Sequence, residues 1–125
     1  MISIGRKRSK KRDEILRVIR STASHPSAHW VYECLKASIP RLSLATVYRN
    51  ITLFMAEGTV ASVCVVDGKE RFDGVVMPHP HFVCTSCGGV FDFPYPPPVY
   101  TDMEGFKIDC RKTVFYGICP HCAAI

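Results

Sequence analysis

The chain has 125 residues, with 16 Lys and Arg against 11 Asp and Glu, and seven cysteines. It lacks any run of about 18 apolar residues, which argues against a transmembrane helix, and its basic N-terminus leads into no apolar signal core, which argues against secretion. We therefore expect a cytoplasmic protein of one or two small domains, in which cysteines more often bind metals than form disulfides.

The charge is distributed unevenly along the chain. Residues 1–50 hold eleven Lys and Arg against three acidic residues, whereas residues 51–125 hold five against eight. Such an asymmetry suggests a nucleic-acid-binding half followed by a half with another role. Because runs of charge are usually solvated, the alternative is a basic segment that serves solubility alone.

Residues 9–58 predict three short helices. Ser9, Ser27 and Ser43 stand where N-cap residues are favoured, and the helices run from these caps to about residues 22, 38 and 58. The residues expected to face inward from the second and third helices are Trp30, Val31, Cys34, Leu35, Leu44, Val47, Ile51, Phe54 and Met55.

The third predicted helix has a polar face at three- and four-residue spacing, formed by Ser43, Thr46, Arg49 and Asn50. Arg can bridge two acceptors of guanine, and Asn can pair with adenine, in the DNA major groove. Three short helices with this face on the third are typical of a helix-turn-helix that binds double-stranded DNA. The alternative is a solvated helix face.

Residues 59–72 predict a β-hairpin with Asp67-Gly68 as a type I′ turn, which makes the motif a winged one. We expect Lys69 and Arg71 on this wing to contact phosphates. The predicted organisation is a DNA-binding domain over residues 1–73, a hinge over residues 74–80 and a second domain over residues 81–125. The second domain is too short to build a self-supporting core.

Two Cys-x-x-Cys pairs, separated by 31 residues, supply a staple for that second domain. Four thiolates arranged as two knuckles form a closed tetrahedral zinc site, so we predict structural zinc at Cys84, Cys87, Cys119 and Cys122. The alternative is redox chemistry, but two such pairs in one small basic protein argue against it.

A second metal site is predicted beside the first zinc knuckle. His79-Pro80-His81 is expected to be extended, with both histidines on the face turned away from the zinc cysteines. If Val83 opposes Val90 in the next strand, His81 opposes Asp92. Such an open His and carboxylate site suits Fe(II) or Mn(II). The alternative is one zinc knuckle with two incidental surface histidines. Downstream, Tyr95–Tyr100 cannot be helical, and we expect a final strand over residues 107–116.

The segments HPSAHWVYECL, SLATVYRNI, RFD at 71–73, HPHFVCTSCGGVFD, GFKI and YGICPHC together carry a family resemblance. The chain resembles the ferric uptake regulator family of metal-sensing bacterial repressors over nearly its whole length, and in particular its peroxide-sensing branch. The resemblance implies an α+β protein: an N-terminal winged helix-turn-helix domain followed by a small zinc-stapled α/β dimerisation domain.

The resemblance also implies roles for individual residues. The regulatory Fe(II) or Mn(II) ligands fall on His25, Asp73, His79, His81 and Asp92. The DNA-contacting positions fall on Ser43, Thr46, Tyr48, Arg49 and Asn50, and we add Lys10, Lys11 and Arg12 from the basic block. In the peroxide-sensing branch, peroxide oxidises a ligand histidine, here His25 or His79, and DNA is released. The implied partners are operator DNA and a second copy of the chain, with no membrane.

The sequence departs from the family between Asp92 and Gly105, where a shortened PYPPPVYTDME stands in place of the dimerisation helix. We therefore expect a homodimer formed through the sheet alone, and the alternatives are a monomer or a different arrangement. The alternative functions are an iron- or zinc-responsive regulator of the same fold without peroxide chemistry, and a zinc-stabilised binding module without sensing. A nucleobase deaminase is disfavoured, because its His-x-Glu and Pro-Cys-x-x-Cys signature is missing.

Overall fold

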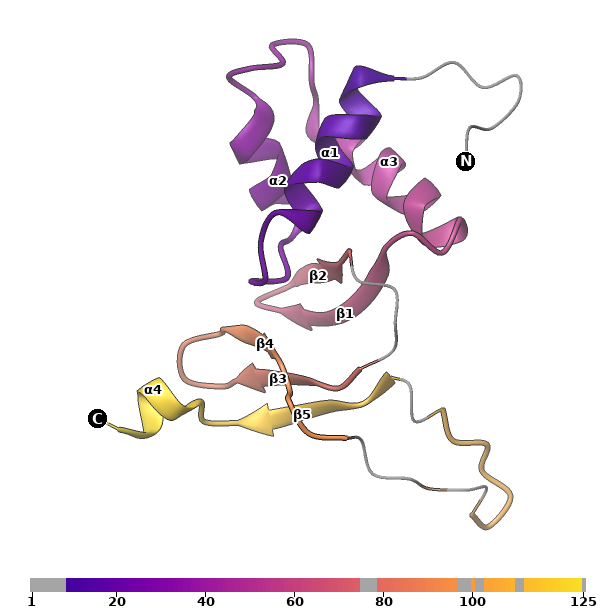
Figure 1. Ribbon diagram of the computed structural model, residues 1–125, viewed down its shortest axis with the longest axis vertical. Helices are drawn as coiled ribbons and strands as arrows, with labels where there is room; N and C mark the ends of the chain where they lie inside the picture. The colour runs from indigo at the N-terminus through magenta and orange to yellow at the C-terminus, as the bar shows by residue number, and fades with distance from the viewer. Residues whose placement is uncertain (1–8, 75–78, 97–99, 101–102, 110–111, 125) are drawn as a thin grey trace.

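A computed structural model describes residues 9–74, 79–96, 100, 103–109 and 112–124. Three helices lie at one end, a β-hairpin crosses the middle and a three-stranded sheet lies beyond it (Figure 1). This architecture confirms the predicted α+β class. The elements are α1 Lys10–Arg20, α2 Ala28–Leu35, α3 Leu44–Ala56, β1 Ala61–Val66, β2 Lys69–Asp73, β3 His81–Cys84, β4 Val90–Asp92, β5 Val114–Gly117 and α4 Pro120–Ala123.

Each of the first three helices begins at its predicted serine cap. The side chains of Ser9, Ser27 and Ser43 each accept a hydrogen bond from the backbone N–H three residues further on, at 3.3, 3.2 and 3.1 Å. These bonds satisfy N–H groups that have no partner within the helix. The helix starts that we predicted from sequence are therefore confirmed.

The core of the helical part is a cluster of apolar side chains from α1, α2, α3 and the hairpin. Phe54 from α3 and Phe72 from β2 are its largest buried members. The prediction was wrong for Trp30, which is 42% exposed, and for Cys34, which is also exposed. The eight-residue α2 buries only the narrow stripe of Ala28, Val31 and Leu35, which leaves both side chains outside it.

Replacement of Ser43 tests the cap of α3. We expect Ser43→Ala to lower the free energy of unfolding by about 1 kcal/mol, because the N–H of Thr46 loses its acceptor. Ser43→Asp, which keeps an acceptor at this exposed position, is expected to stay within a few tenths of a kcal/mol of the wild type. Urea denaturation followed by circular dichroism measures both variants; equal losses would show that the cap does not stabilise the helix.

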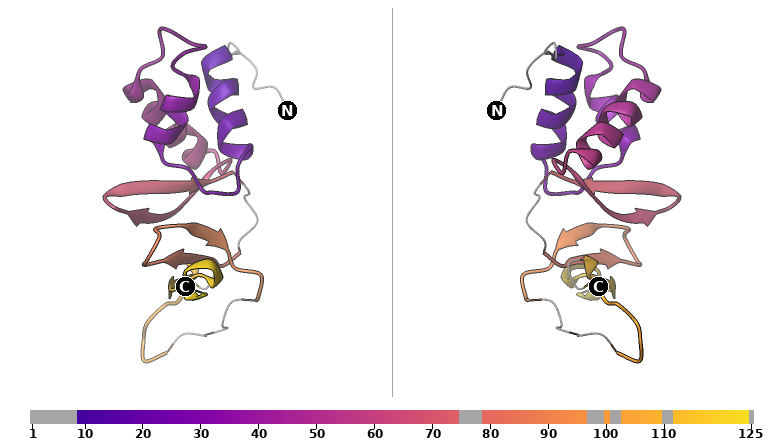
Figure 2. Two further views of the ribbon diagram at one scale, coloured as in Figure 1. Left: turned by 90° about the vertical axis from the view of Figure 1, so that its left-hand side faces the viewer. Right: turned by 90° about the vertical axis from the view of Figure 1, so that its right-hand side faces the viewer.

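The hairpin β1–β2 lies between the helices and the second sheet (Figures 1 and 2). Asp67 and Gly68 have φ values of 51° and 75°, which confirms the predicted type I′ turn. Its tip packs against the first cysteine knuckle: a Cβ placed on Gly88 would lie 3.6 Å from Cγ1 of Val66. The hairpin thus joins the helical part to the second sheet.

The second sheet has the strand order β4-β3-β5, with β3 antiparallel to β4 and parallel to β5. His81 pairs with Asp92, and Val83 pairs with Val90, which is the register that we had assumed from the sequence. The sheet therefore places His81 and Asp92 side by side, on the face that is turned toward the hairpin.

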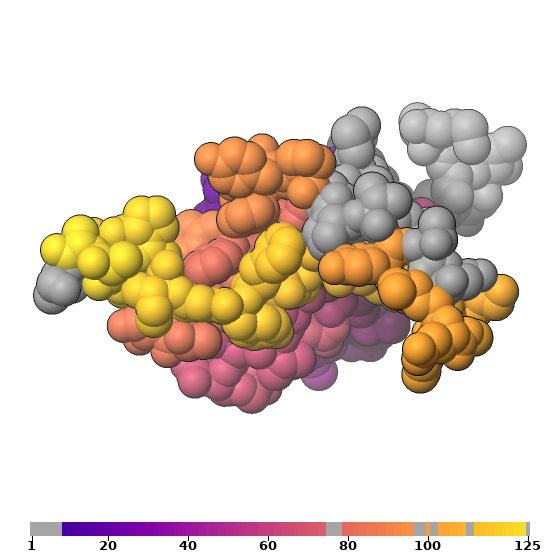
Figure 3. All heavy atoms as spheres, turned by 90° about the horizontal axis from the view of Figure 1, so that it is seen from below, coloured from indigo at the N-terminus to yellow at the C-terminus, as the bar shows by residue number. Residues whose placement is uncertain are grey.

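The segment between β4 and β5 contains no α-helix among its described residues. Residues 103–109 instead project from one end of the second unit, by which we mean the second sheet, α4 and the segments between them. They lie opposite α4 (Figure 3) and expose Phe106. The final strand was predicted too early: β5 starts only at Val114, because the N–H of Lys112 turns back to the carbonyl of Asp109 at 3.2 Å.

Several predictions fall outside the described residues: the basic block up to residue 8, and positions 75–78 and 97–99 of the predicted hinge and proline-rich segment. In the part of the chain that the structure describes, none of the helices is long and apolar enough to cross a membrane.

Candidate metal centres

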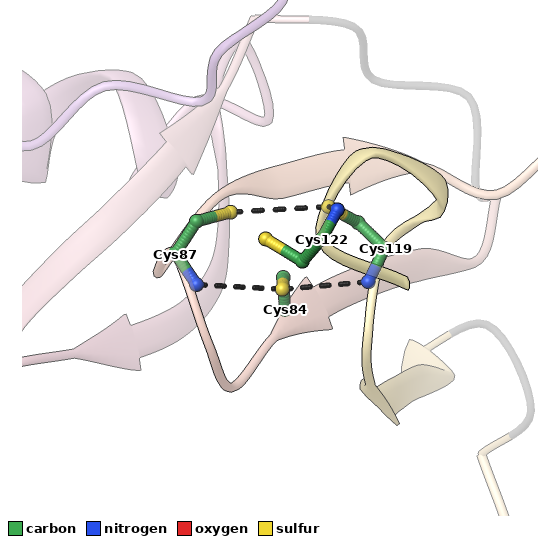
Figure 4. A group of neighbouring side chains, drawn as sticks. All are labelled: Cys84, Cys87, Cys119 and Cys122. Carbon is green, nitrogen blue, oxygen red and sulfur yellow. Dashed lines mark hydrogen bonds between the residues drawn. The ribbon is translucent and has the colours of Figure 1, made fainter. Parts of the chain in front are cut away.

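The four predicted zinc cysteines converge in the second unit. Cys84 ends β3, and Cys87 follows in the turn to β4. Cys119 caps the start of α4, and Cys122 lies within this helix (Figure 4). Their sulfur atoms all lie within 4.8 Å of one another, and the Sγ atoms of Cys87 and Cys119 are 4.0 Å apart. Tetrahedral zinc with bonds of about 2.3 Å needs sulfurs about 3.8 Å apart, so the cluster fits a Zn²⁺ ion.

The charge state of this cluster also fits a cation. The N–H groups of Cys87 and Cys119 donate to the sulfur of Cys84, which lowers the pKa of that thiol to about 6. A hydrogen bond with Ser86 lowers the pKa of Cys122, but hydrogen bonds with Cys119 and the other cluster thiols, together with burial, raise it to about 12. A cation bound among the four sulfurs would favour their deprotonated forms.

A second cluster gathers five residues from both parts of the molecule. His25 comes from the loop between α1 and α2, and Asp73 ends β2. His81 begins β3, His79 lies two residues before it, and Asp92 ends β4. One donor atom from each residue lies within 4.8 Å of the donors of the other four. Every residue predicted for the regulatory site is thus brought to one point.

The two carboxylates bridge the three imidazoles. Oδ2 of Asp73 lies 3.2, 3.0 and 3.0 Å from Nε2 of His25, His79 and His81. Oδ1 of Asp92 lies 2.9, 2.7 and 3.5 Å from the same three nitrogens. The Asp73 side chain is 8% exposed, whereas that of Asp92 is 52% exposed. The cluster therefore has an enclosed side at Asp73 and an open side at Asp92.

His25 is the most enclosed of the three histidines, with 3% of its side chain exposed. Its Nδ1 lies 3.1 Å from the carbonyl oxygen of Val90, which only accepts, so Nδ1 donates and Nε2 points to the carboxylates. Burial lowers the pKa of His25, but hydrogen bonds to Asp73 and Asp92 outweigh it, and the net pKa is raised. Nε2 is therefore the atom that this ring would offer to a metal ion.

The polar face of α3 has the side chains predicted from sequence. The Thr46 hydroxyl contacts Ser43 Oγ at 2.9 Å and accepts from Nη2 of Arg49 at 3.4 Å. Asn50 donates to the backbone carbonyl of Thr46 at 2.9 Å, whereas Tyr48 is 47% exposed. Ser43, Tyr48 and Arg49 are exposed, whereas Thr46 and Asn50 are partly buried. The contact of all five residues with DNA stays a prediction.

The basic residues at the start of α1 differ in their surroundings. Lys10 and Lys11 border a shallow hollow of about 420 Å³ at the protein surface. Arg12 instead forms a 2.7 Å ion pair with Glu57, and its guanidinium lies 4.8 Å from the centre of the Phe54 ring. Arg12 therefore links α1 to the end of α3, whereas the two lysines are better placed to reach a partner.

Sequence reasoning missed the contacts that one wing residue makes with the site. Arg71, which we predicted to contact phosphates, donates from Nε to the carbonyl of His25 and from Nη2 to the carbonyl of Ser24 at 2.7 Å. The carbonyl of Val90, which orients the His25 ring, was also missed, since a backbone acceptor leaves no trace in the sequence. These contacts place Arg71 beside the metal-binding cluster.

The fold and its two clusters define a winged-helix protein with a four-cysteine site and a separate His and Asp site. The chain matches the Ferric uptake regulator family over residues 3–104. It is 33% identical over 118 residues to the peroxide operon regulator of Bacillus subtilis (strain 168), covering 90% of this chain and 81% of that protein. The chain therefore belongs to the ferric uptake regulator family, which makes it a transcription regulator and not an enzyme.

Solved structures support the same assignment. The Campylobacter jejuni peroxide stress regulator superposes with a TM-score of 0.68 at 26% identity, covering 90% of this chain and 88% of that chain. The Helicobacter pylori ferric uptake regulator Fur superposes with a TM-score of 0.73 at 19% identity, covering 95% and 83%. At that identity the second likeness shows the fold alone. The similarity to the peroxide regulators of Bacillus subtilis and Campylobacter jejuni confirms the predicted resemblance to the peroxide-sensing branch.

Proposed function

We propose that the chain is a metal-dependent repressor that binds operator DNA and is released from it by hydrogen peroxide. The observation that carries this proposal is the composition of the His and Asp cluster. His25 and Asp73 come from the helices and the hairpin, whereas His79, His81 and Asp92 come from the second sheet and the residues just before it. A metal held by all five residues fixes how the two parts sit relative to each other.

This arrangement couples metal binding to DNA binding. In our proposal residues 1–73 bind DNA, residues 74–80 form a hinge and residues 81–125 dimerise through the sheet. The two recognition helices of a dimer must match half-sites about one helical turn apart. When the five ligands close around a metal, they select the relative orientation of the domains that meets this spacing. Bound metal then raises the affinity of the protein for operator DNA, and bound DNA raises its affinity for the metal.

The donor sets assign the metals. Four sulfurs suit structural Zn²⁺ at the cysteines, whereas three imidazole nitrogens and two carboxylates suit Fe(II) or Mn(II). An Fe(II) ion held by these residues would catalyse cleavage of the O–O bond of hydrogen peroxide, a reaction that Mn(II) would support poorly. The open side at Asp92 gives peroxide access, and the enclosed side keeps the ligands ordered.

The step that releases DNA is the oxidation of a ligand histidine. One oxygen atom of peroxide enters a ring C–H bond of His25 or His79, and the other leaves as water. The Nε2 atoms of both rings lie within 3.2 Å of the Asp73 carboxylate, so both are close to the reaction. The modified ring is a weaker donor, and the link between the two parts of the molecule is lost.

DNA binding before and after peroxide tests this proposal. We expect zinc-loaded protein to bind operator DNA with either added Fe(II) or Mn(II). Peroxide should reduce the affinity of the Fe(II) form at least about 10-fold, a loss of about 1.4 kcal/mol, and should leave the Mn(II) form bound. Mass spectrometry of peptides should find one added oxygen at His25 or His79 in the Fe(II) sample alone.

The controls separate peroxide sensing from metal sensing. The His121→Ala variant removes an exposed histidine outside both clusters and should respond like the wild type. If DNA binding requires Fe(II) but persists after treatment with peroxide, the chain is instead an iron-responsive regulator. If Fe(II), Mn(II) and peroxide all leave the DNA affinity unchanged, the chain is a zinc-stabilised binding module without sensing.

A further inference from the structure

The ligand loop that contains His25 has an unusual backbone conformation. His25 has a φ of 57°, in the left-handed region that residues other than glycine seldom adopt. Such a conformation persists only where surrounding contacts offset its cost. The placement of the His25 ring therefore depends on whatever holds residues 24–27.

Two successive residues of β2 hold this loop. Arg71 donates from Nε to the carbonyl of His25 and from Nη2 to the carbonyl of Ser24, the latter at 2.7 Å. The N–H of Phe72 donates to the carbonyl of Pro26 at 3.0 Å, and Arg71 forms an isolated antiparallel bridge with Ser27. Each residue of the 24–27 loop is thus tied to the hairpin.

We propose that Arg71 is a positioning residue for the regulatory metal site, a role that rests on the function proposed above. Residues two apart in a strand share a face, so Arg71 and Asp73 project from the same face of β2. Asp73 contributes its own carboxylate to the cluster, and Arg71 fixes the backbone of His25. The short strand β2 therefore sets both His25 and Asp73, the two ligands that precede the second sheet.

The contacts of Arg71 set this role apart from the phosphate contact expected of a wing arginine. Its guanidinium already donates to two carbonyls of one loop, and such a planar fork reaches two acceptors at a fixed separation. A lysine has the same charge but no fork. The role therefore depends on the geometry of the arginine and not on its charge.

Metal affinity measures this role directly. In the zinc-loaded protein, we expect Arg71→Ala and Arg71→Lys to weaken Mn(II) binding about 10- to 100-fold, which a chelator competition assay measures. Losses of this size are typical when a residue that orients a metal ligand is removed. Arg17→Ala, which removes an arginine paired with Glu14 on the surface of α1, should leave Mn(II) affinity unchanged. The d–d absorption of Co(II) bound to Arg71→Ala should shift in the same direction as that of His25→Ala.

A double-mutant cycle identifies the path of the effect. In a His25→Ala background, Arg71→Ala should cause no further loss of Mn(II) affinity, because the ligand that it positions is gone. Full additivity would overturn the positioning role and indicate general damage to the structure. An Arg71→Ala variant that keeps Mn(II) affinity but loses DNA affinity would also overturn it, in favour of a phosphate contact.

The same measurements keep the two proposals apart. If His25→Ala binds Mn(II) as tightly as the wild type, the regulatory site itself is wrong, and the role of Arg71 with it. If His25→Ala weakens binding and Arg71→Ala does not, only the positioning role fails. If Arg71→Ala does not fold, Arg71→Lys tests the role, because it keeps the charge and most of the packing. A wild-type Mn(II) affinity in Arg71→Lys would overturn the positioning role.

Discussion

Loss of one zinc cysteine is expected to unfold the second unit. We expect Cys84→Ala to bind no zinc after desalting and to lose the protected amides of β3, β4 and β5. The buried sulfur of Cys84 accepts from the N–H groups of Cys87 and Cys119, so its removal breaks both knuckles at once. Structural zinc contributes about 10–16 kcal/mol in zinc-finger peptides, more than a unit of this size gains from its core.

Cys34→Ala is the matched control, because Cys34 is exposed on α2 and lies outside the cluster. It should keep a full equivalent of zinc and wild-type amide exchange. Zinc content is measured with a colorimetric chelator, and exchange by mass spectrometry. Protected β3–β5 amides in zinc-free Cys84→Ala would show that the sheet stands without the metal.

The features predicted well from sequence are those set by neighbouring residues. The serine caps, the Asp67-Gly68 turn and the pairing of β3 with β4 all follow from local patterns, and the structure has each of them. The pairing mattered most, because a shift of one residue would have turned His81 away from Asp92. The alternation of residues along β3 thus predicted two separate metal clusters.

The features that sequence patterns missed depend on distant parts of the chain. His25 and Asp92 are 67 positions apart and meet only because the hairpin joins the two parts of the molecule. The family resemblance supplied His25, whereas local patterns made it part of a turn. Sequence patterns predicted a phosphate contact for Arg71, and nothing local indicated that its side chain donates to carbonyls of residues 24–27.

The two carboxylates of the His and Asp cluster should differ in importance. Asp73→Asn keeps the shape of the side chain but removes the buried charge that lies within 3.2 Å of all three Nε2 atoms. Removing one partner from a buried charged group costs about 3–5 kcal/mol, so we expect Mn(II) affinity to fall by more than about 100-fold. Operator binding in the presence of Mn(II) should be lost with it.

Asp92→Asn is the matched control, since it makes the same change on the open side of the cluster. The Asp92 side chain is 52% exposed, so water can take the place of its oxygen and solvent screens its charge. We expect a smaller loss of Mn(II) affinity than in Asp73→Asn, with full zinc content in both variants. Equal losses of Mn(II) affinity in the two variants would show that burial does not determine how much each carboxylate contributes to metal binding. Unchanged DNA binding by Asp73→Asn would mean that this cluster does not control the repressor.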